Sequence, residues 1–461
     1  MSPIRESTVW KFMAASFVLA LGFGVLALKA VWSPSGGTDT RVVSQASQPG
    51  EYSSGGDELS TLSPGPEASD SAVGGSGGSS GSTGTRNAPA PRIQGGVITI
   101  GAIITLTGPF DGRPAENVLK AHVQMVNEQG GINGHQLRLI VYDDGFDATK
   151  GMIAAKRLVE QDKVFAVVGW LSPATEPQAA PYFASQGVPV IGGIGPPQEF
   201  GPASIFPANP DTSKMWMGAL RFFCQSGAKK PAVVLIDLAW TDAMAAGINK
   251  GLETNCGLKP VSTDKVSGAE PDFSPYVIKW RAAGVDSIVA VIDPVSYSKL
   301  FNAARSQNWN PFVFTGGAPV MDAEGKPVVV GLDGMINVES EIFPYLHRDH
   351  PGVRRFESTV RRYAPTKLMN GNMELVWTAA QIFVEGMRRA GSEPDRGKLI
   401  RALDGLRDFK TDLSPPISYW PGNHDPIKCQ EIRGWKDVYD SWQCWEYQGN
   451  TRAVPAPSRP F

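Results

Sequence analysis

The sequence predicts an α/β protein whose folded part consists of two lobes, each built on a parallel sheet. From residue 97 onward, short apolar runs alternate with amphipathic stretches, and this alternation begins afresh near Ala232. Apolar strands that alternate with amphipathic helices are typical of a parallel sheet covered by helices on both faces. With 461 residues, 42% of them hydrophobic, the chain is long enough to fill two such cores.

The N-terminal segment predicts export. Arg5 and Lys11 precede an apolar run at 12–28, whose about 17 residues are few for a membrane span and many for a signal-peptide core. No small-residue cleavage site and no nearby cysteine for lipid attachment follow, which favours an uncleaved anchor over a cleaved signal peptide. Positive charge before the span places residues 1–8 in the cytoplasm as a short tail, with 9–32 as the transmembrane anchor or signal peptide. The remainder is then extracytoplasmic, in the periplasm or on the outer cell surface, and either anchored or secreted.

Residues 33–95 are expected to form a disordered linker. Gly, Ser, Pro, Thr and Ala dominate this stretch, which includes the run GGSGGSSGSTG at 74–84. Such a chain buries too little apolar surface to offset the entropy of ordering. The G-x-S-x-G match at Gly77, Ser79 and Gly81 follows from this composition, because a nucleophile elbow needs a strand before it and a helix after it.

The first half of the folded region contains four apolar runs that predict strands, at 97–105, 137–142, 164–169 and 188–191. Two intervening stretches place apolar residues on one helical face: Leu119, His122, Val123 and Val126 in the first, and Met152, Ala155, Leu158 and Val159 in the second. Asp147 stands where the second helix needs an N-cap. The order strand, helix, strand predicts parallel pairing.

The second half repeats the pattern, with expected strands at 232–236, 285–292 and 312–314 and long helices at about 350–363 and 371–390. In open parallel sheets, ligands bind beyond the carboxyl ends of the strands. The expected site is therefore a cleft between the lobes. Its borders are the loops after Thr105, Gly169, Ile191, Ile236, Ile292 and Phe314.

Five segments occur in an order and at spacings that resemble the Leu/Ile/Val-binding family of type I periplasmic binding proteins. They are ITIGAIITLTGPF at 98–110, VNEQGGINGHQLRLIVYDD at 126–144, DATKGMIAAKRLVEQDKVFAVVGWLSPAT at 147–175, GVPVIGG at 187–193 and PPISYWPGNHD at 415–425. The resemblance covers almost all of 97–430. Local backbone geometry also explains why Gly130, Gly131 and Gly134 are glycines, since each allows the positive φ of a sharp helix-to-strand turn.

The resemblance implies two Rossmann-like lobes joined by a three-segment hinge, with crossovers near 206–211, 336–342 and 413–419. Lobe 1 would comprise residues 96–210 and 340–415, and lobe 2 would comprise 211–339 and 416–461. It also implies ligand contacts from loops at the strand ends. The predicted ligand-binding residues are Thr107, Phe110, Trp170, Ser172, Thr175, Gly195, Pro196, Trp240, Asp293 and Gly317.

Several of these positions depart from the amino-acid binders of the family. Pro196 replaces a threonine, Gly317 stands where an acidic residue is expected, and Trp240 or the following threonine replaces a tyrosine. Asp293 is either a substitute partner for a ligand ammonium or the N-cap of the next helix. We therefore expect a ligand other than an ordinary α-amino acid. The aromatic residues Phe110, Trp170, Trp240 and Tyr297 favour an aromatic or amide-like organic molecule, although aromatic side chains also serve as core residues.

Four cysteines, Cys224, Cys256, Cys429 and Cys444, are disulfide candidates. They allow three pairings, of which the local pairs Cys224–Cys256 and Cys429–Cys444 need the least excursion of the chain, and the latter would close a hairpin. Export favours at least one disulfide, whereas buried thiols are the alternative. No C-x-x-C spacing indicates zinc.

Composition and motifs exclude several functions. The net charge of −2 provides no basic field for nucleic acid. The five histidines are scattered, HRDH at 347–350 is interpreted as a solvated loop, and no nucleotide-binding motif occurs, so we expect no metal, cofactor or catalytic residue. The predicted function is capture of a small molecule and delivery to an ABC transporter permease. The alternative is a ligand-sensing ectodomain that signals through a partner protein.

Overall fold

A computed structural model of the chain describes the folded region with short gaps. The described residues are 96–108, 111–225, 227–239, 241–268, 270–316, 321–322, 335–339, 347–365, 368–369, 371–425, 429–434, 438–447 and 453–455. The predicted tail, anchor and linker at 1–95 lie outside them. Among the helices that the structure describes, none is both long and apolar enough to cross a membrane.

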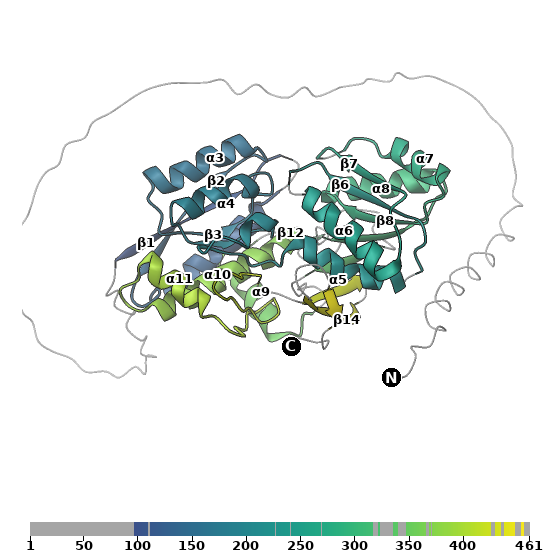
Figure 1. Cartoon of the computed structure of the whole chain (residues 1–461). Helices are drawn as coiled ribbons and strands as arrows, with labels where there is room; N and C mark the ends of the chain where they lie inside the picture. The colour runs from purple at the N-terminus through teal and green to yellow at the C-terminus, as the bar shows by residue number, and fades with distance from the viewer. Residues whose placement is uncertain are drawn as a thin grey trace, which may run out of the picture. The chain divides into compact units, whose positions relative to one another are not determined.

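The first sheet has five parallel strands in the order β2-β1-β3-β4-β5 (Figure 1). They are β1 (Val97–Ile104), β2 (Gln136–Asp143), β3 (Ala166–Trp170), β4 (Val190–Gly192) and β5 (Ile205–Phe206). The four predicted strands are confirmed to within about two residues at each end. The two-residue β5 was not predicted, because so short a strand has no period to recognise.

Helices cover both faces of this sheet (Figure 1). The core on one face involves α2 (Arg113–Glu128), α10 (Gly371–Ala390) and α11 (Arg396–Asp404), whereas the other involves α3 (Ala148–Lys156), η1 (Arg157–Gln161) and α4 (Glu176–Ser185). Another helix, α9 (Pro351–Tyr363), packs on α2 and α10. The alternation of β1 explains this layering, because Ile100, Ala102 and Ile104 lie in the first core and Ile103 in the second.

The second sheet has eight strands in the order β15-β14-β13-β11-β9-β8-β6-β7. The parallel strands are β6 (Pro231–Ile236), β7 (Ser262–Val266), β8 (Ser287–Val291), β9 (Phe312–Gly316) and β11 (Met335–Glu339). The antiparallel strands are β13 (Cys429–Gly434), β14 (Val438–Tyr447) and β15 (Ala453–Pro455). A separate two-stranded sheet pairs β10 (Met321–Asp322) with β12 (Leu368–Met369).

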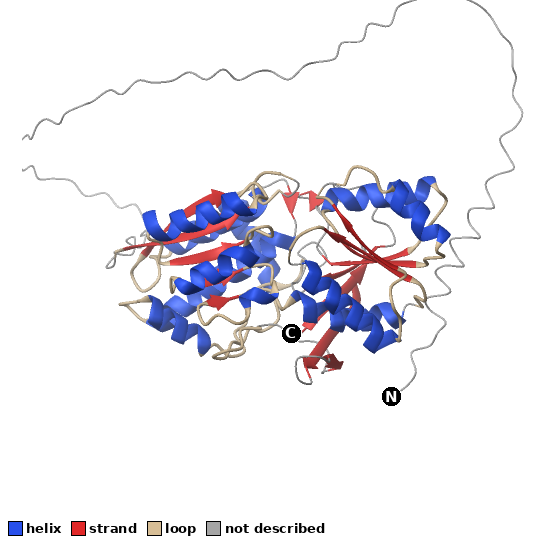
Figure 2. Cartoon of the chain, turned by 45° about the horizontal axis from the view of Figure 1, so that its top comes forward, coloured by secondary structure: helices blue, strands red, loops and turns tan. Residues whose placement is uncertain are grey.

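Helices also cover the parallel part of the second sheet (Figure 2). One core involves α5 (Thr212–Gln225) and α6 (Thr241–Cys256), and the other involves α7 (Ser274–Ala282) and α8 (Pro294–Ser306). The predicted α/β class with two parallel sheets is therefore confirmed.

The cysteines follow the local pairing. A disulfide joins Cys224 of α5 to Cys256 of α6 across a sequence separation of 32, which confirms that prediction. In the register of β13 and β14, Cys429 lies opposite Cys444, as a hairpin closed by these residues requires. A disulfide between this second pair remains a prediction.

Local signals are confirmed at the end of one helix and at the start of another. Gly130, Gly131 and Gly134 have φ values of +96°, +79° and +85°, and a Cβ on Gly131 would lie 2.0 Å from the His135 carbonyl oxygen. The interpretation of HRDH at 347–350 as a solvated loop ahead of Pro351 is confirmed, because these residues are exposed or half-buried and precede α9. His350 is the N-cap of α9, and its Nδ1 accepts a hydrogen bond from the Gly352 N–H at 3.3 Å.

Candidate functional site

The loops that follow β1, β3 and β4 meet at the carboxyl edge of the first sheet. The N–H of Thr105 donates to the Leu171 carbonyl at 3.0 Å, and the N–H of Gly193 donates to the Trp170 carbonyl at 3.0 Å. Parallel pairing brings together strand ends that are far apart in the sequence. The structure thus collects Thr107, the loop after β3 and the loop after β4 at one edge, as the carboxyl-end rule predicts.

Asp144 binds the hydroxyl groups of this edge. Its fully buried carboxylate accepts hydrogen bonds from the hydroxyls of Thr105 at 2.7 Å, of Thr175 at 2.7 Å and of Ser172, and from the N–H of Phe146 at 3.0 Å. We predicted that Ser172 and Thr175 contact the ligand. In this structure both side chains are fully buried, and their hydroxyls donate to Asp144 instead.

Asp143 holds the loop after β1 in a similar way. Its carboxylate accepts from the N–H groups of Leu106 at 2.8 Å, Thr107 at 3.3 Å and Gly145 at 2.8 Å, and from the Thr107 hydroxyl at 2.6 Å. Partial burial acts to raise the pKa of Asp143, but these four donors outweigh it and lower the pKa below its ordinary value. Thr107 is exposed at the edge, with its hydroxyl proton directed to Asp143.

Two further carboxyl groups, which sequence reasoning missed, lie beneath the loops. Glu176, the first residue of α4, accepts from the N–H of Ser172 at 2.9 Å and from the N–H of Ile194 at 2.8 Å, so it bridges the loops after β3 and β4. Glu199, in the short helix η2 (Pro197–Glu199), accepts from the N–H of Gly195 at 3.3 Å. Both side chains are fully buried. In the sequence, the one available signal was that each glutamate stands among apolar residues. It was missed because an acidic residue in the first turn of a helix is usually explained by its favourable interaction with the helix dipole at the surface.

The two glutamates form a pair that holds a proton. No N–H or O–H donor of the described residues reaches Oε1 of Glu199, and its carboxyl group is hydrogen-bonded to that of Glu176. Burial raises the pKa of Glu176 to about 7, against the opposing effect of the Ser172 and Ile194 N–H groups. Burial and then the negative charge of Glu176 raise the pKa of Glu199 well above its ordinary value. The pair therefore retains a proton at a pH at which exposed carboxyl groups have lost theirs.

Glycines allow the loop after β4 to fold around this pair. Gly193 has a φ of +106°, and a Cβ at this position would lie 2.4 Å from both carboxylate oxygens of Glu199. Gly195 has a φ of +85° and lies against the Pro210 carbonyl. Pro196, which the resemblance places where relatives have a threonine, is buried and supplies neither a hydroxyl nor an N–H.

Two aromatic residues that were expected at the cleft belong to the cores. The Trp170 indole is fully buried among residues of α3 and α4 and makes an edge-to-face contact with Phe183 at 5.4 Å. Tyr297 is 5% exposed, and its hydroxyl donates to the Ala290 carbonyl at 3.1 Å and contacts Thr315. The prediction that these side chains face the cleft was wrong in this structure, because each completes the packing between a sheet and its helices.

Of the four remaining predicted residues, one caps a helix and three lie outside the described residues. Asp293 is the N-cap of α8 and accepts from the N–H groups of Val295 at 3.1 Å and Ser296 at 3.0 Å. The structure thus supports the helix-cap alternative for this aspartate. Phe110, Trp240 and Gly317 lie outside the described residues.

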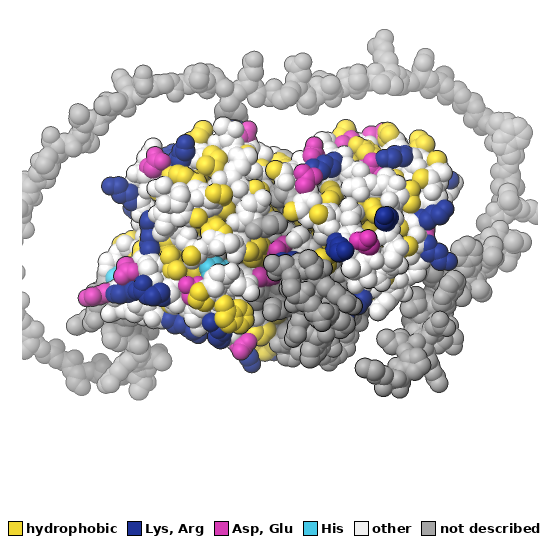
Figure 3. Space-filling view, in the orientation of Figure 1, with side chains coloured by type: hydrophobic (Ala, Val, Ile, Leu, Met, Phe, Trp, Pro, Cys, Tyr) yellow, Lys and Arg dark blue, Asp and Glu magenta, His cyan; other side chains and the backbone are white. Residues whose placement is uncertain are grey.

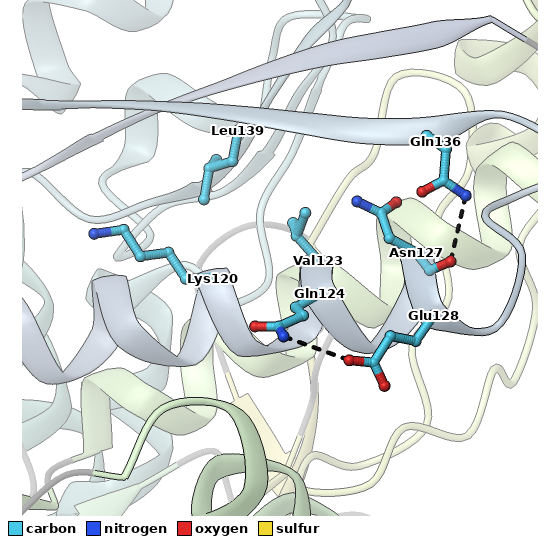
Figure 4. Close-up of a pocket in the computed structure, with 7 residues that line it drawn as sticks. All are labelled: Lys120, Val123, Gln124, Asn127, Glu128, Gln136 and Leu139. Carbon is cyan, nitrogen blue, oxygen red and sulfur yellow. Dashed lines mark hydrogen bonds between the residues drawn. The ribbon is translucent and has the colours of Figure 1, made fainter.

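Two surface pockets are lined by residues outside the loops after β1, β3 and β4. One, of about 420 Å³, lies between α2 and β2 (Figure 4), and Gln136 at its rim is the first residue of β2, so the pocket borders the amino ends of the strands. The other, of about 330 Å³, lies between the start of α9 and residues 410–416. Figure 3 shows Lys and Arg interspersed with Asp and Glu over the visible described surface, as the net charge predicts.

The site loops are linked to the chain segment that enters the second sheet. The Thr212 hydroxyl, at the start of α5, donates to the Gly195 carbonyl at 3.0 Å. Two of the predicted crossover segments also contact each other, because the buried Tyr419 hydroxyl donates to the Pro207 carbonyl at 2.6 Å. The loop after β4 and the start of α5 are therefore joined by a direct hydrogen bond.

Comparison with known proteins identifies relatives across most of the folded region. The sequence matches the family model described as periplasmic binding protein over residues 97–438. A Leu/Ile/Val-binding protein homolog 3 of Brucella melitensis is 28% identical over 333 residues, which cover 68% of this chain and 85% of that protein. An amino acid binding protein of Pseudomonas aeruginosa is 29% identical over 200 residues, which cover 40% of this chain and only about half (52%) of that protein.

Solved structures share the fold at low sequence identity. A fatty acid ABC transporter substrate-binding protein from Thermomonospora curvata has a TM-score of 0.66 at 16% identity, covering 78% of this chain and 95% of that one. A solute-binding protein of an ABC transporter from R. palustris, in complex with benzoate, has a TM-score of 0.62 at 15% identity with the same coverage. With two parallel sheets and a family match over most of its folded region, the chain belongs to the type I periplasmic binding proteins.

Proposed function

We propose that this chain captures a small organic molecule between its two lobes, outside the cytoplasm, and delivers it to an ABC transporter permease. The observation that carries this proposal is the gathering of the loops after β1, β3 and β4 at the carboxyl edge of the first sheet. Ligands of open parallel sheets bind at that edge. The family consists of solute-binding proteins rather than enzymes, and it is extracytoplasmic, which supports the same function.

The ligand is expected to differ from an ordinary α-amino acid. Pro196 offers neither a hydroxyl nor an N–H, and the hydroxyls of Ser172 and Thr175 are bonded to Asp144. The structural neighbours described above, one named for fatty acids and one solved with benzoate, support the idea that this fold accommodates organic ligands of different shapes. Nanomolar binding of leucine or glutamate would contradict this expectation.

Binding can be tested with the purified full-length chain. A metabolite panel screened by thermal shift and followed by calorimetry should yield an organic ligand of micromolar affinity or better. Thr107→Val, which removes an exposed hydroxyl, should then weaken binding several-fold, because this hydroxyl lies at the strand edge where the ligand is expected. The matched control is Thr254→Val on α6, whose hydroxyl bonds only within its own helix. Equal effects of the two variants would argue against a site at this edge.

Two further measurements address closure and delivery. Closure of the lobes on the ligand should lower the radius of gyration in small-angle scattering, and an unchanged radius would argue against it. Uptake of the labelled ligand by cells that carry the permease should depend on this chain. Tight binding without any effect on uptake would instead favour the ligand-sensing alternative.

The membrane prediction for residues 9–32 is part of this proposal. An anchor would hold the binding region at the outer face of the membrane, at the end of the linker expected at 33–95. Cell fractionation should recover the full chain with membranes and a variant without residues 1–32 in the cytosol. Recovery of the full chain in the soluble extracytoplasmic fraction, shortened at its N-terminus, would indicate a cleaved signal peptide instead.

A further inference from the structure

We propose that the ligand presents an uncharged or cationic group, and not a carboxylate, to the loops that follow β1, β3 and β4. This inference rests on the proposed function and specifies the ligand class for the same site. It departs from what the resemblance implies, since small hydroxyls and free N–H groups at strand ends would suit a ligand carboxylate.

The first argument is that internal carboxyl groups already occupy at least two donors in each of these loops. After β1, the N–H groups of Leu106 and Thr107 and the Thr107 hydroxyl donate to Asp143. After β3, the hydroxyls of Ser172 and Thr175 donate to Asp144 and the N–H of Ser172 donates to Glu176. After β4, the N–H of Ile194 donates to Glu176 and the N–H of Gly195 donates to Glu199. A ligand carboxylate that binds any of these donors would have to displace its internal acceptor.

The second argument is electrostatic. Asp144 and the Glu176–Glu199 pair, which shares a proton, are completely buried, and Asp143 lies at the rim of the same edge. The negative charge that remains on these carboxyl groups acts through a lower effective dielectric than water provides, so a further anion placed here is repelled. Lys150 is a nearby cation, with its ammonium 3.6 Å from where a Cβ on Gly145 would lie, but the side chain is exposed and its charge is screened.

The first test compares ligands that share a skeleton and differ in the head group. Calorimetry on the full-length chain would measure benzoate, benzamide and benzamidine, then hexanoate, hexanamide and hexylamine, then leucine and leucinamide. We expect the amide or the cationic member of at least one series to bind ten-fold or more tightly than its acid. If an acid binds as tightly as its amide, the inference about the head group is wrong but the proposed function stands. If none of these compounds binds, both the inference and the proposed function are contradicted.

The second test needs no ligand. Hydrogen exchange of the free full-length chain should show protected N–H groups at Ser172, Ile194 and Gly195, because each donates to a buried carboxyl group. In Glu176→Ala, the N–H groups of Ser172 and Ile194 should exchange at least ten-fold faster, whereas the exposed control Glu253→Gln on α6 should leave them unchanged. Exchange of all three at the rate of free loop amides in the unaltered chain would overturn the inference, since the donors would then be available to a carboxylate.

Discussion

The buried Glu176–Glu199 pair should make the stability of the fold depend on pH. The ordinary pKa of Glu176 is 4.5, and in the folded chain burial raises it to about 7. Between these values the folded state retains a proton that the unfolded state has lost. The stabilising contribution of this proton is therefore fully present below pH 4.5 and is lost as the pH rises through 7.

The size of this effect follows from the pKa difference. At about 1.4 kcal/mol per pKa unit, a rise from 4.5 to about 7 corresponds to about 3 kcal/mol, most of which falls between pH 5 and pH 8. Because Glu176 is fully buried, no reduction for solvent screening applies. The loss belongs to the pair, since the two carboxyl groups titrate together.

The perturbation that isolates this effect is Glu176→Gln. Gln accepts through one oxygen only, whereas Glu176 accepts N–H groups at both oxygens, so the variant should be less stable by about 1 to 3 kcal/mol at low pH. Because the variant lacks the Glu176 carboxyl group, its disadvantage should shrink by roughly 2 to 3 kcal/mol as the pH rises from 5 to 8.

Urea unfolding followed by tryptophan fluorescence at pH 5, 6, 7 and 8 would measure these free energies. Glu253→Gln, an exposed position on α6, is the matched control and should keep a constant difference from the unaltered chain. A constant difference between Glu176→Gln and the unaltered chain over the same range would refute the assignment of a raised pKa to the buried pair.

Three further substitutions test separate features. Cys224→Ser together with Cys256→Ser removes the disulfide. Because this disulfide closes a loop with a sequence separation of 32, its loss should destabilise the chain by about 3 to 4 kcal/mol. An unchanged melting temperature would contradict a stabilising disulfide. Tyr419→Phe deletes a buried 2.6 Å hydrogen bond and should cost about 1 kcal/mol in denaturant unfolding; a neutral result would show that the bond contributes nothing. Gly193→Ala places a Cβ at a φ of +106° and 2.4 Å from the Glu199 carboxyl oxygens, so it should lower the free energy of unfolding by at least about 2 kcal/mol. Gly187→Ala, at a φ of +58° with open space around it, should lower it by about 1 kcal/mol. Equal losses in the two variants would contradict the clash at Gly193.

Local sequence patterns predicted the elements that bury one continuous face. The apolar run of β1, the helical periodicity of α2 and the cap residue Asp147 of α3 are each determined by neighbours within a few positions, and all three are confirmed. The same reasoning missed β7, whose sequence STDKV is mostly polar. This strand pairs with a single neighbour at the edge of its sheet, so its pairing rather than its apolar content makes it a strand.

The sequence by itself also placed Thr107, Ser172 and Thr175 at strand ends of the candidate site, because carboxyl ends of parallel strands share one edge. Only the tertiary structure decided what these groups bind. Asp144 lies 28 to 39 positions along the sequence from the residues whose hydroxyls donate hydrogen bonds to it, and no local pattern encodes contacts over such separations. The pairing of Glu176 with Glu199 has the same origin. Packing removed both carboxyl groups from water, and this burial raises the pKa of both.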